Sequence, residues 1–251
     1  MFNLRVLTVA AGVIAVTASL SQAQDTDVKA IVRKAIDAHG GTKNLDKYKA
    51  FNTKFKGTMT IMGVKVNVDG DTTLQKPDKV KNVLILDING KSIDVTNVFN
   101  GKKLWVKTMG QTKEIDDEKI LKAAREEMES EGAGSLLDFL KAPYELNTIG
   151  EVKVKDKDAI GVRISKKGQK DITMFFDKKT HLVVKTETQA YDPSNGQEVL
   201  QEKFIHSYQK KHGMEVARRV EIVKDGKTFM DIEITEVTPL ETVDASIFAK
   251  P

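Results

Sequence analysis

The densest run of turn signals in the sequence, residues 76–107, constrains the fold more than any other feature. It reads KPDKVKNVLILDINGKSIDVTNVFNGKKLWVK, in which Asn89-Gly90 and Asn100-Gly101 separate apolar segments. A type I′ turn needs a positive φ at both central residues, so each dipeptide predicts a tight β-hairpin. Pro77 has no backbone N–H and belongs at the start of a strand. The run therefore predicts consecutive antiparallel strands.

The same rhythm of strand-like segments and short turns fills most of the chain. Connections of a few residues force neighbouring strands to be antiparallel, because a parallel crossover needs a dozen or more residues. The pattern predicts an antiparallel sheet of about eleven or twelve strands. The predicted strands cover residues 51–62, 64–75, 80–88, 92–99, 102–109, 145–155, 159–165, 171–176, 181–191, 198–208, 213–223 and 228–238.

A few helical patterns interrupt the strands. The middle of the chain carries two of them, and Gly132 and Gly134 lie between them as a candidate hinge. Apolar residues at helical spacing mark the first helix, which stops at Gly40-Gly41. The predicted helices cover residues 27–38, 43–48, 116–131, 135–140 and 244–248.

Side-chain alternation along the strands indicates how the sheet is covered. Residues 230–235 alternate between apolar and polar, which is typical of a strand with one buried face. Residues 83–86 and 174–176 are apolar at successive positions, so both faces of these strands are expected to be covered. A sheet of this many strands curls, and the helices can plug the resulting half-closed barrel. The eight methionines suit either an adaptable apolar cavity or an ordinary core.

The N-terminus predicts export. Residues 1–23 contain one charge, Arg5, then an apolar run that ends in Ser21-Gln22-Ala23, which is the pattern of a cleaved signal peptide. The alternative, a transmembrane anchor, is disfavoured because the apolar run is shorter than the ~20 residues that span a bilayer. The chain has no cysteine, so neither a lipid anchor nor a disulfide is expected. These features predict a periplasmic protein.

The residue types that carry catalysis or metal binding are sparse and scattered. His39, His181, His206 and His212 have no partner at metal-ligand spacing, and we expect exposed or locally bonded histidines. No Gly-x-Ser-x-Gly motif is present. The net charge of +4 is spread along the chain and forms no nucleic-acid stripe. We therefore expect no catalytic residues, no metal, no cofactor and no nucleic-acid partner.

Three short motifs resemble a known family. They are Lys76-Pro77-Asp78-Lys79-Val80, Asn100-Gly101-Lys102-Lys103-Leu104-Trp105, and the C-terminal Val243-Asp244-Ala245-Ser246-Ile247-Phe248 after Thr238-Pro239. Together with the signal peptide and the helical insertion in a long meander, they resemble the LolA/LolB-like periplasmic carriers of outer-membrane lipoproteins. One departure concerns Lys76, which occupies the place where the family has an arginine that tethers its lid. Lysine lacks the planar, bidentate fork of arginine.

The resemblance implies an open antiparallel half-barrel of α+β class whose concave apolar face is lidded by helices. It implies one domain at residues 24–251, with a lid insertion at 116–140, that carries acyl chains as a monomer. Envelope proteins of the inner and outer membranes are the implied partners, and Lys76 is the implied lid contact. The residues expected to line the cavity are Val83, Ile85, Phe99, Leu104, Trp105, Ile120, Leu121, Leu136, Leu137, Leu140, Met174, Phe176, Met230, Ile232 and Ile234.

Two other functions remain open from the sequence. The first is a structural or protein-interaction module of the cell envelope, whose sheet is filled by its own side chains. The second is a lipid hydrolase, which requires a serine, a histidine and a carboxylate to converge at the mouth of the apolar cleft.

Overall fold

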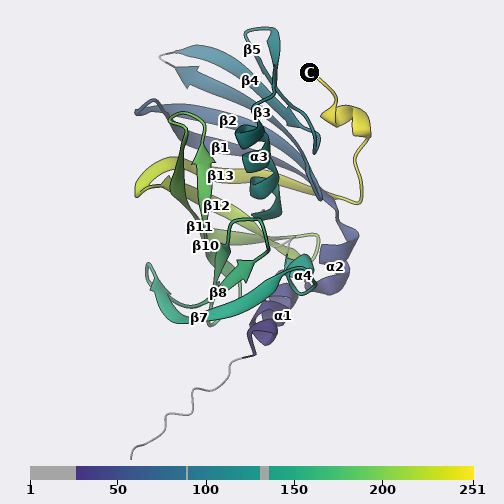
Figure 1. The fold of residues 1–251 in the computed structure, drawn as a ribbon, viewed down its shortest axis with the longest axis vertical. Coiled ribbons are helices and arrows are strands. Elements are labelled where there is room, and N and C mark those ends of the chain that lie inside the picture. The colour runs from purple at the N-terminus through teal and green to yellow at the C-terminus, as the bar shows by residue number, and fades with distance from the viewer. Residues whose placement is uncertain (1–26, 89, 131–135) are drawn as a thin grey trace, which may run out of the picture.

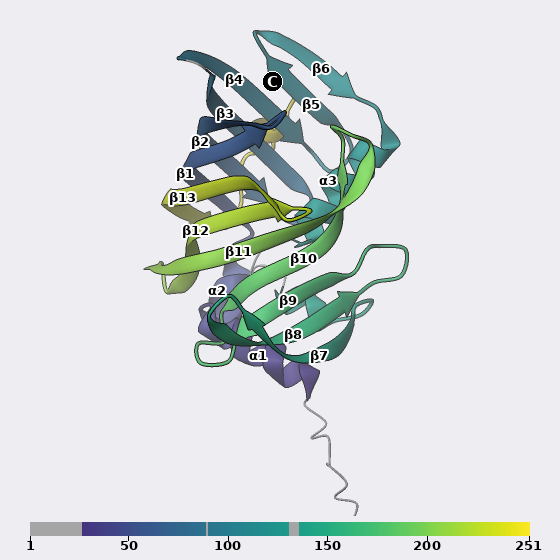
Figure 2. The same ribbon diagram turned by 90° about the vertical axis from the view of Figure 1, so that its left-hand side faces the viewer.

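The computed structural model describes residues 27–88, 90–130 and 136–251. They form one antiparallel sheet of 13 strands in the order β6-β5-β4-β3-β2-β1-β13-β12-β11-β10-β9-β8-β7 (Figure 2). The strands are β1 (Ala50–Ile61), β2 (Val64–Gln75), β3 (Lys79–Ile88), β4 (Lys91–Phe99), β5 (Leu104–Thr108), β6 (Gln111–Ile115), β7 (Glu145–Val154), β8 (Lys157–Ser165), β9 (Ile172–Asp177), β10 (Val183–Asp192), β11 (Gln197–Lys211), β12 (Met214–Lys224) and β13 (Lys227–Leu240).

The helices are few, as the sequence predicts. Figure 1 shows α3 lying across the sheet, with α1, α2 and α4 gathered at one end of it. None of the helices in the described part of the chain is long and apolar enough to cross a membrane. The helices are α1 (Val28–Ala38), α2 (Gly41–Lys47), α3 (Glu118–Ser130), α4 (Leu136–Phe139) and the 3-10 helix η2 (Ala245–Phe248).

Three sequence predictions fall wholly or partly outside the described residues. They are the signal peptide, the first hairpin turn at Asn89, and the hinge at Gly132 and Gly134. The strands that flank Asn89 do pair in hairpin register, with Ile88 opposite Lys91.

The second predicted hairpin turn differs in length from the expected one. Phe99 pairs with Leu104, so the connection has four residues instead of two. The Asn100 side chain closes it by accepting hydrogen bonds from the backbone N–H groups of Lys102 and Lys103, at 3.1 and 2.9 Å. An asparagine that folds back onto its own turn is an ordinary Asx turn.

Strand pairing fixes which side chains share a face of the sheet. Directly paired residues lie on the same face, and successive residues of a strand lie on opposite faces. One continuous row runs Val66, Met59, Met230, Ile222, Lys203, Thr186, Met174, Val162 across eight strands, from β2 to β8. We call the face that carries this row the inner face and the opposite one the outer face.

The helices pack on the inner face. Val32 and Ile36 of α1, together with Leu136 and Phe139 of α4, form one buried cluster with Met174 and other inner-face residues of β8–β11. Leu121 and Met128 of α3 pack separately against Phe99, Leu74, Val80 and Leu104 of β2–β5. The 3-10 helix η2 packs on the outer face instead, where Phe248 contacts Val98 and Trp105.

Two strand glycines shape the inner face at the middle of the sheet. Gly70 lies directly opposite Phe55, whose ring occupies the space that a Gly70 side chain would fill. Gly57 lies opposite Ile232, and an added Cβ there would be 2.1 Å from the Asp231 carbonyl oxygen. Glycine inside a strand is typical of a bend or a close backbone approach.

A charged cluster ties together strands of the sheet through Glu221. Its carboxylate accepts hydrogen bonds from Lys155 at 2.8 Å, from His206 at 2.9 Å and from Thr228 at 3.1 Å. The bond from Lys155, followed by those from His206 and Thr228, lowers the pKa of Glu221 to about 2, against partial burial, which raises it.

This pKa predicts an acid-sensitive contribution to stability. The unfolded carboxyl titrates near 4.5, so the contribution is complete above that pH and is lost as the pH falls towards 2. After allowance for solvent screening we expect about 1–2 kcal/mol. Chemical denaturation from pH 6 to pH 2.5 measures it: a Glu221→Gln variant should show a shallower loss than the wild type. Glu233→Gln is the control, because it removes a carboxylate from a more exposed ion pair with Arg218. Its stability should fall with pH as steeply as that of the wild type.

Candidate functional site

The inner face carries an apolar surface that no described helix covers. Its buried members are Phe55, Val66, Val68, Leu86, Val220 and Ile232, all from strands β1–β3, β12 and β13. Around them lie partly buried side chains, which are Met59, Ile61, Leu84, Ile88, Ile93, Val95, Ala217, Ile222, Met230 and Ile234. We call this set the apolar floor. Among the described residues, no helix contributes to it.

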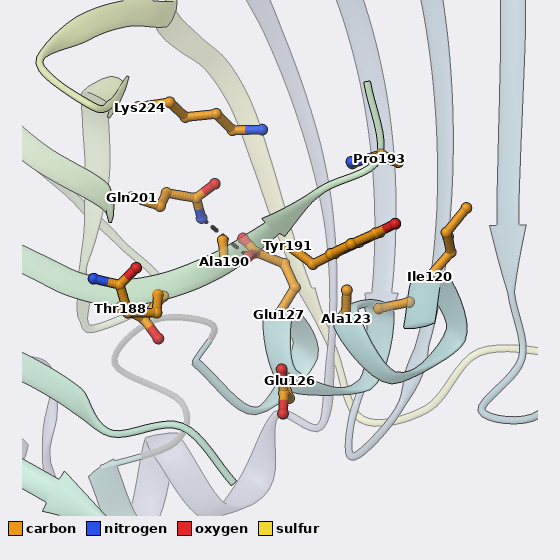
Figure 3. A pocket seen from close by; sticks show the side chains of 12 residues that line it. Ile120, Ala123, Glu126, Glu127, Thr188, Ala190, Tyr191, Pro193, Gln201 and Lys224 are labelled. Atoms are coloured by element: carbon orange, nitrogen blue, oxygen red, sulfur yellow. Dashed lines mark hydrogen bonds between the residues drawn. The ribbon is translucent and has the colours of Figure 1, made fainter. Parts of the chain in front are cut away.

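A small cavity adjoins the apolar floor, between α3 and the inner face of β10–β12. Most of its lining surface is apolar, and we call it the polar cavity after the polar side chains that its sheet wall contributes. It has a volume of about 290 Å³. Ile120, Ala123 and Ala124 of α3 give it an apolar side, and Thr188, Gln201 and Lys224 give it a polar wall (Figure 3). Glu126, Glu127, Gln189, Ala190, Tyr191 and Pro193 complete the lining.

Strand register places the cavity next to the apolar floor. Gln201 pairs with Lys224, and two residues along the same strands Lys203 pairs with Ile222. Ile222 in turn pairs with Met230, and both belong to the apolar floor. A ligand can therefore contact the polar cavity and the apolar floor at the same time.

Two polar contacts of Glu127 join α3 to the sheet at the cavity. Gln201 Nε2 donates a 3.0 Å hydrogen bond to Glu127 Oε2, as Figure 3 shows, and Lys203 Nζ lies 3.8 Å from Glu127 Oε1. Apolar packing of Leu121, Ala124 and Met128 around Phe99 holds the adjacent side of the helix. The helix N-terminus is capped by Asp117, which accepts from the Lys119 backbone N–H at 2.8 Å.

Most of the residues predicted to line the cavity lie on the inner face or on the helices that cover it. Met230, Ile232 and Ile234 belong to the apolar floor, and Ile120 lines the polar cavity. Met174, Phe176, Leu136, Leu137 and Leu140 pack together under α1, while Phe99, Leu104 and Leu121 pack under α3. Packed side chains of this kind support the sheet, and they contact a ligand only if a helix moves.

Three of the predicted residues lie on the wrong face. Val83 and Ile85 alternate with the inner-face residues Leu84 and Leu86, so they point outward, and Ile85 is 45% exposed. Trp105 is paired with Val98 on the outer face, is buried beside Phe248, and donates a 3.0 Å hydrogen bond to Glu114. The prediction that these three line the inner cavity is therefore wrong.

Lys76 lies close to the end of α4. Burial lowers its pKa to about 8, and the negative charge of Asp138 in α4 opposes that shift. Lys49 and Lys141 lower the pKa further, and Asp46 raises it. The ammonium group of Lys76 therefore interacts electrostatically with Asp138 of α4. This agrees with the lid contact that the resemblance implies.

The cavity lining contains carboxylates but no serine or histidine. Among residues 27–88, 90–130 and 136–251, no three His, Asp or Glu side chains cluster in a way that would hold a metal ion. His39 is buried at the end of α1, where its Nδ1 donates to the Ala35 carbonyl at 2.8 Å and burial lowers its pKa. His206 bonds Glu221.

Sequence reasoning missed the polar wall of the cavity and all of the apolar floor except Met230, Ile232 and Ile234. Gln201 and Lys203 lie in the stretch VLQEKFI, which has no clean alternation, so nothing in it marks an inward polar wall. Leu84 and Leu86 lie in a run that is apolar at every position, and such a run does not show which residues face inward.

Comparison with known proteins identifies the fold. No family model and no curated protein matches the chain. A DUF1329 family protein from Desulfovibrio piger superposes with a TM-score of 0.58 at 13% identity, covering 88% of this chain and 97% of its own. A candidate outer membrane lipoprotein-sorting protein domain from Vibrio parahaemolyticus gives 0.55 at 12% identity, covering 88% and 96%. A LolA superfamily protein from Nitrosomonas europaea gives 0.52 at 11% identity, covering 89% and 97%.

These similarities confirm the predicted fold class. The chain shares its open antiparallel sheet and covering helices with LolA-like proteins over most of its length. The sheet has 13 strands, slightly more than the sequence predicts.

Proposed function

We propose that this protein is a non-catalytic periplasmic carrier that binds hydrophobic ligands, the acyl chains of lipoproteins or lipids, on the apolar floor. The observation that carries the proposal is the floor itself, an apolar inner face that lacks a helical cover among the described residues. Transfer from water contributes about 0.8 kcal/mol per buried CH₂, so such a surface can hold a long acyl chain.

Two further observations support a carrier. The fold is shared with an outer membrane lipoprotein-sorting candidate and a LolA superfamily protein. The helix α3 lies against the inner face through the apolar contacts around Phe99 and the hydrogen bond between Gln201 and Glu127, a position that suits a lid over a ligand. In this proposal residues 24–251 act as one exported domain, a monomer that receives and releases acyl chains at envelope proteins of the two membranes.

A charge on the apolar floor tests the proposal. Leu84 belongs to the floor, and its neighbour Ile85 lies on the outer face of the same strand. We expect Leu84→Asp to weaken binding of a fluorescent fatty acid at least about tenfold, because a carboxylate cannot be desolvated beside an acyl chain without a large cost. Fluorescence titration measures the Kd.

Ile85→Asp is the matched control, since it makes the same chemical change one residue away on the exposed face. It should leave the Kd within about twofold of wild type. The milder Leu84→Asn separates lost binding from lost folding, with thermal unfolding as the check. If wild-type protein binds no fatty acid, or if both aspartate variants bind like wild type, the proposal is wrong. A protein that binds no lipid but captures an envelope protein would favour the interaction module.

A further inference from the structure

We infer that the end of the sheet formed by the β1–β2, β3–β4 and β5–β6 hairpins is a docking surface for a membrane that contains anionic lipids. The inference goes beyond the proposed acyl-chain binding and does not depend on it. Figures 1 and 2 show the three hairpins projecting on the far side of the molecule from α1 and α2.

Two of these hairpins carry a methionine at the tip. Met62 and Met109, each followed by a glycine, are 99% and 80% exposed. Val64, after the first tip, is 58% exposed, and Ile85, which lines a hollow on the outer face together with Met109, is 45% exposed. These are four of the six large apolar side chains that the described residues expose. Exposed apolar surface is therefore concentrated at this end of the sheet.

The backbone at both tips adds a second cost. The φ angles of Met62 and Met109 are 49° and 50°, in the left-handed region that non-glycine residues other than asparagine and aspartate rarely adopt. The two-residue turn between β12 and β13 has the more usual Asp225 at the same position. Strained residues of this kind concentrate at functional sites. A bilayer that takes up both methionine side chains would offset the cost of exposing them to water.

Positive charge surrounds the tips. Four lysines lie within three residues of the three turns, against one acidic residue, Asp87. The lysines are Lys65, Lys91, Lys107 and Lys113, and the ion pairs of the described residues involve none of them. Anionic head groups attract each lysine near a bilayer surface, and this attraction adds to the insertion of apolar side chains.

The spacing of the tips fits a bilayer better than a protein partner. Met62 and Met109 are separated by four strand spacings, which is roughly 20 Å across the sheet. Two separate protrusions do not supply the continuous area of about 800 Å² that each partner buries in a stable protein–protein interface. A bilayer accepts each tip on its own and presents its head groups to the lysines between them.

The apolar floor ends at the same hairpins. Ile61 of the floor is paired with Val64, and Ile88 of the floor is paired with Lys91. Docking at this end therefore brings the floor next to the bilayer.

Vesicle flotation tests the inference. Mature full-length protein is mixed with vesicles of phosphatidylcholine, either alone or with roughly 30% phosphatidylglycerol, which supplies the negative surface charge. Wild type should bind the phosphatidylglycerol vesicles at least about tenfold more tightly, and added salt should weaken this binding.

The double variant Met62→Asn/Met109→Asn should bind these vesicles at least about tenfold more weakly than wild type, because its tips have no apolar side chain to insert. Asparagine tolerates the left-handed backbone, so thermal unfolding should show the variant to be at least as stable as wild type. Ile149→Asn/Leu200→Asn makes the same change at two exposed apolar residues of β7 and β11. This control should bind vesicles within about twofold of wild type.

A second pair of variants tests the lysines. Lys91→Gln/Lys113→Gln should reduce the preference for phosphatidylglycerol vesicles by about tenfold. Lys29→Gln/Lys34→Gln changes the net charge equally on exposed lysines of α1 and should keep the preference. Equal losses in the two variants would mean that net charge, and not the hairpin end, determines binding, and would overturn the inference.

Two further results would also overturn it. One is wild-type protein that does not bind phosphatidylglycerol vesicles, and the other is equal binding by wild type and Met62→Asn/Met109→Asn. Dimerisation of wild type without vesicle binding, lost in this double variant, would assign the tips to a second copy of the chain instead. Fatty-acid binding by the double variant should stay within about twofold of wild type, so docking and acyl-chain binding are tested separately.

Discussion

Phe99→Ala is expected to lower the free energy of unfolding by about 3–5 kcal/mol, because loss of the ring leaves a cavity between α3 and the sheet. Phe99 is 1% exposed and shares a buried cluster with Leu121 and Met128 of α3. The partly buried Leu74 and Leu104 of the sheet cannot fill the space without moving. Urea denaturation measures the loss, and amide hydrogen exchange should show α3 losing protection before the strands do.

Ile85→Ala on the neighbouring strand provides the control, since Ile85 is 45% exposed on the outer face. Its cost should stay near 0.5 kcal/mol, as for other exposed substitutions. Similar costs for the two variants would mean that the contact between Phe99 and α3 contributes little to stability.

Gly57→Ala is expected to cost about 3 kcal/mol, at the upper end of the range for overpacking. Its new methyl group would lie 2.1 Å from the Asp231 carbonyl oxygen and 2.7 Å from Ile232 Cα. Both atoms belong to the backbone of β13, so no side chain can rotate away to relieve the clash. β1 and β13 must separate, and they hold the two halves of the sheet together. Thermal unfolding, with circular dichroism as the probe, measures the effect.

Gly161→Ala is the matched control, an alanine placed at another strand glycine. There the new methyl group meets Ile149 side-chain atoms at 2.3 and 2.5 Å, and Ile149 is 40% exposed and able to move. We expect about 1 kcal/mol for this change. If the Gly57→Ala protein is as stable as the Gly161→Ala protein, then β1 and β13 can move apart at little cost in free energy.

The sequence was sufficient for most of the fold because its turn residues carry specific backbone requirements. The strands Val64–Gln75 and Lys79–Ile88 match the prediction to within a residue. The strand Gln111–Ile115 was missed because QTKEI is short and polar, and only its pairing with β5 identifies it. A polar edge strand of this kind has no periodic apolar signal to detect.

The candidate site was less predictable, for a physical reason that Trp105 illustrates. A large apolar residue in a strand can face either side of a sheet that is covered on both sides. Trp105 packs under η2 on the outer face, and that contact joins residues more than a hundred positions apart in the chain. The polar cavity likewise depends on α3 meeting β11, a contact that neither local sequence encodes.

The pairing of β1 with β13 has a consequence for how the protein folds. Within β1–β6 and within β7–β13, each strand pairs only with its neighbours in sequence. The pairing of β1 with β13 instead brings together Ala50 and Leu240, which are 190 positions apart. Loop-closure entropy makes such a distant contact slow to form, so each half is expected to assemble first and the two to join last. The apolar floor contains residues from both halves, and Met59 of β1 lies opposite Met230 of β13. The apolar floor is therefore complete only after the final step of folding, and if the floor binds acyl chains as we propose, ligand binding reports that step directly.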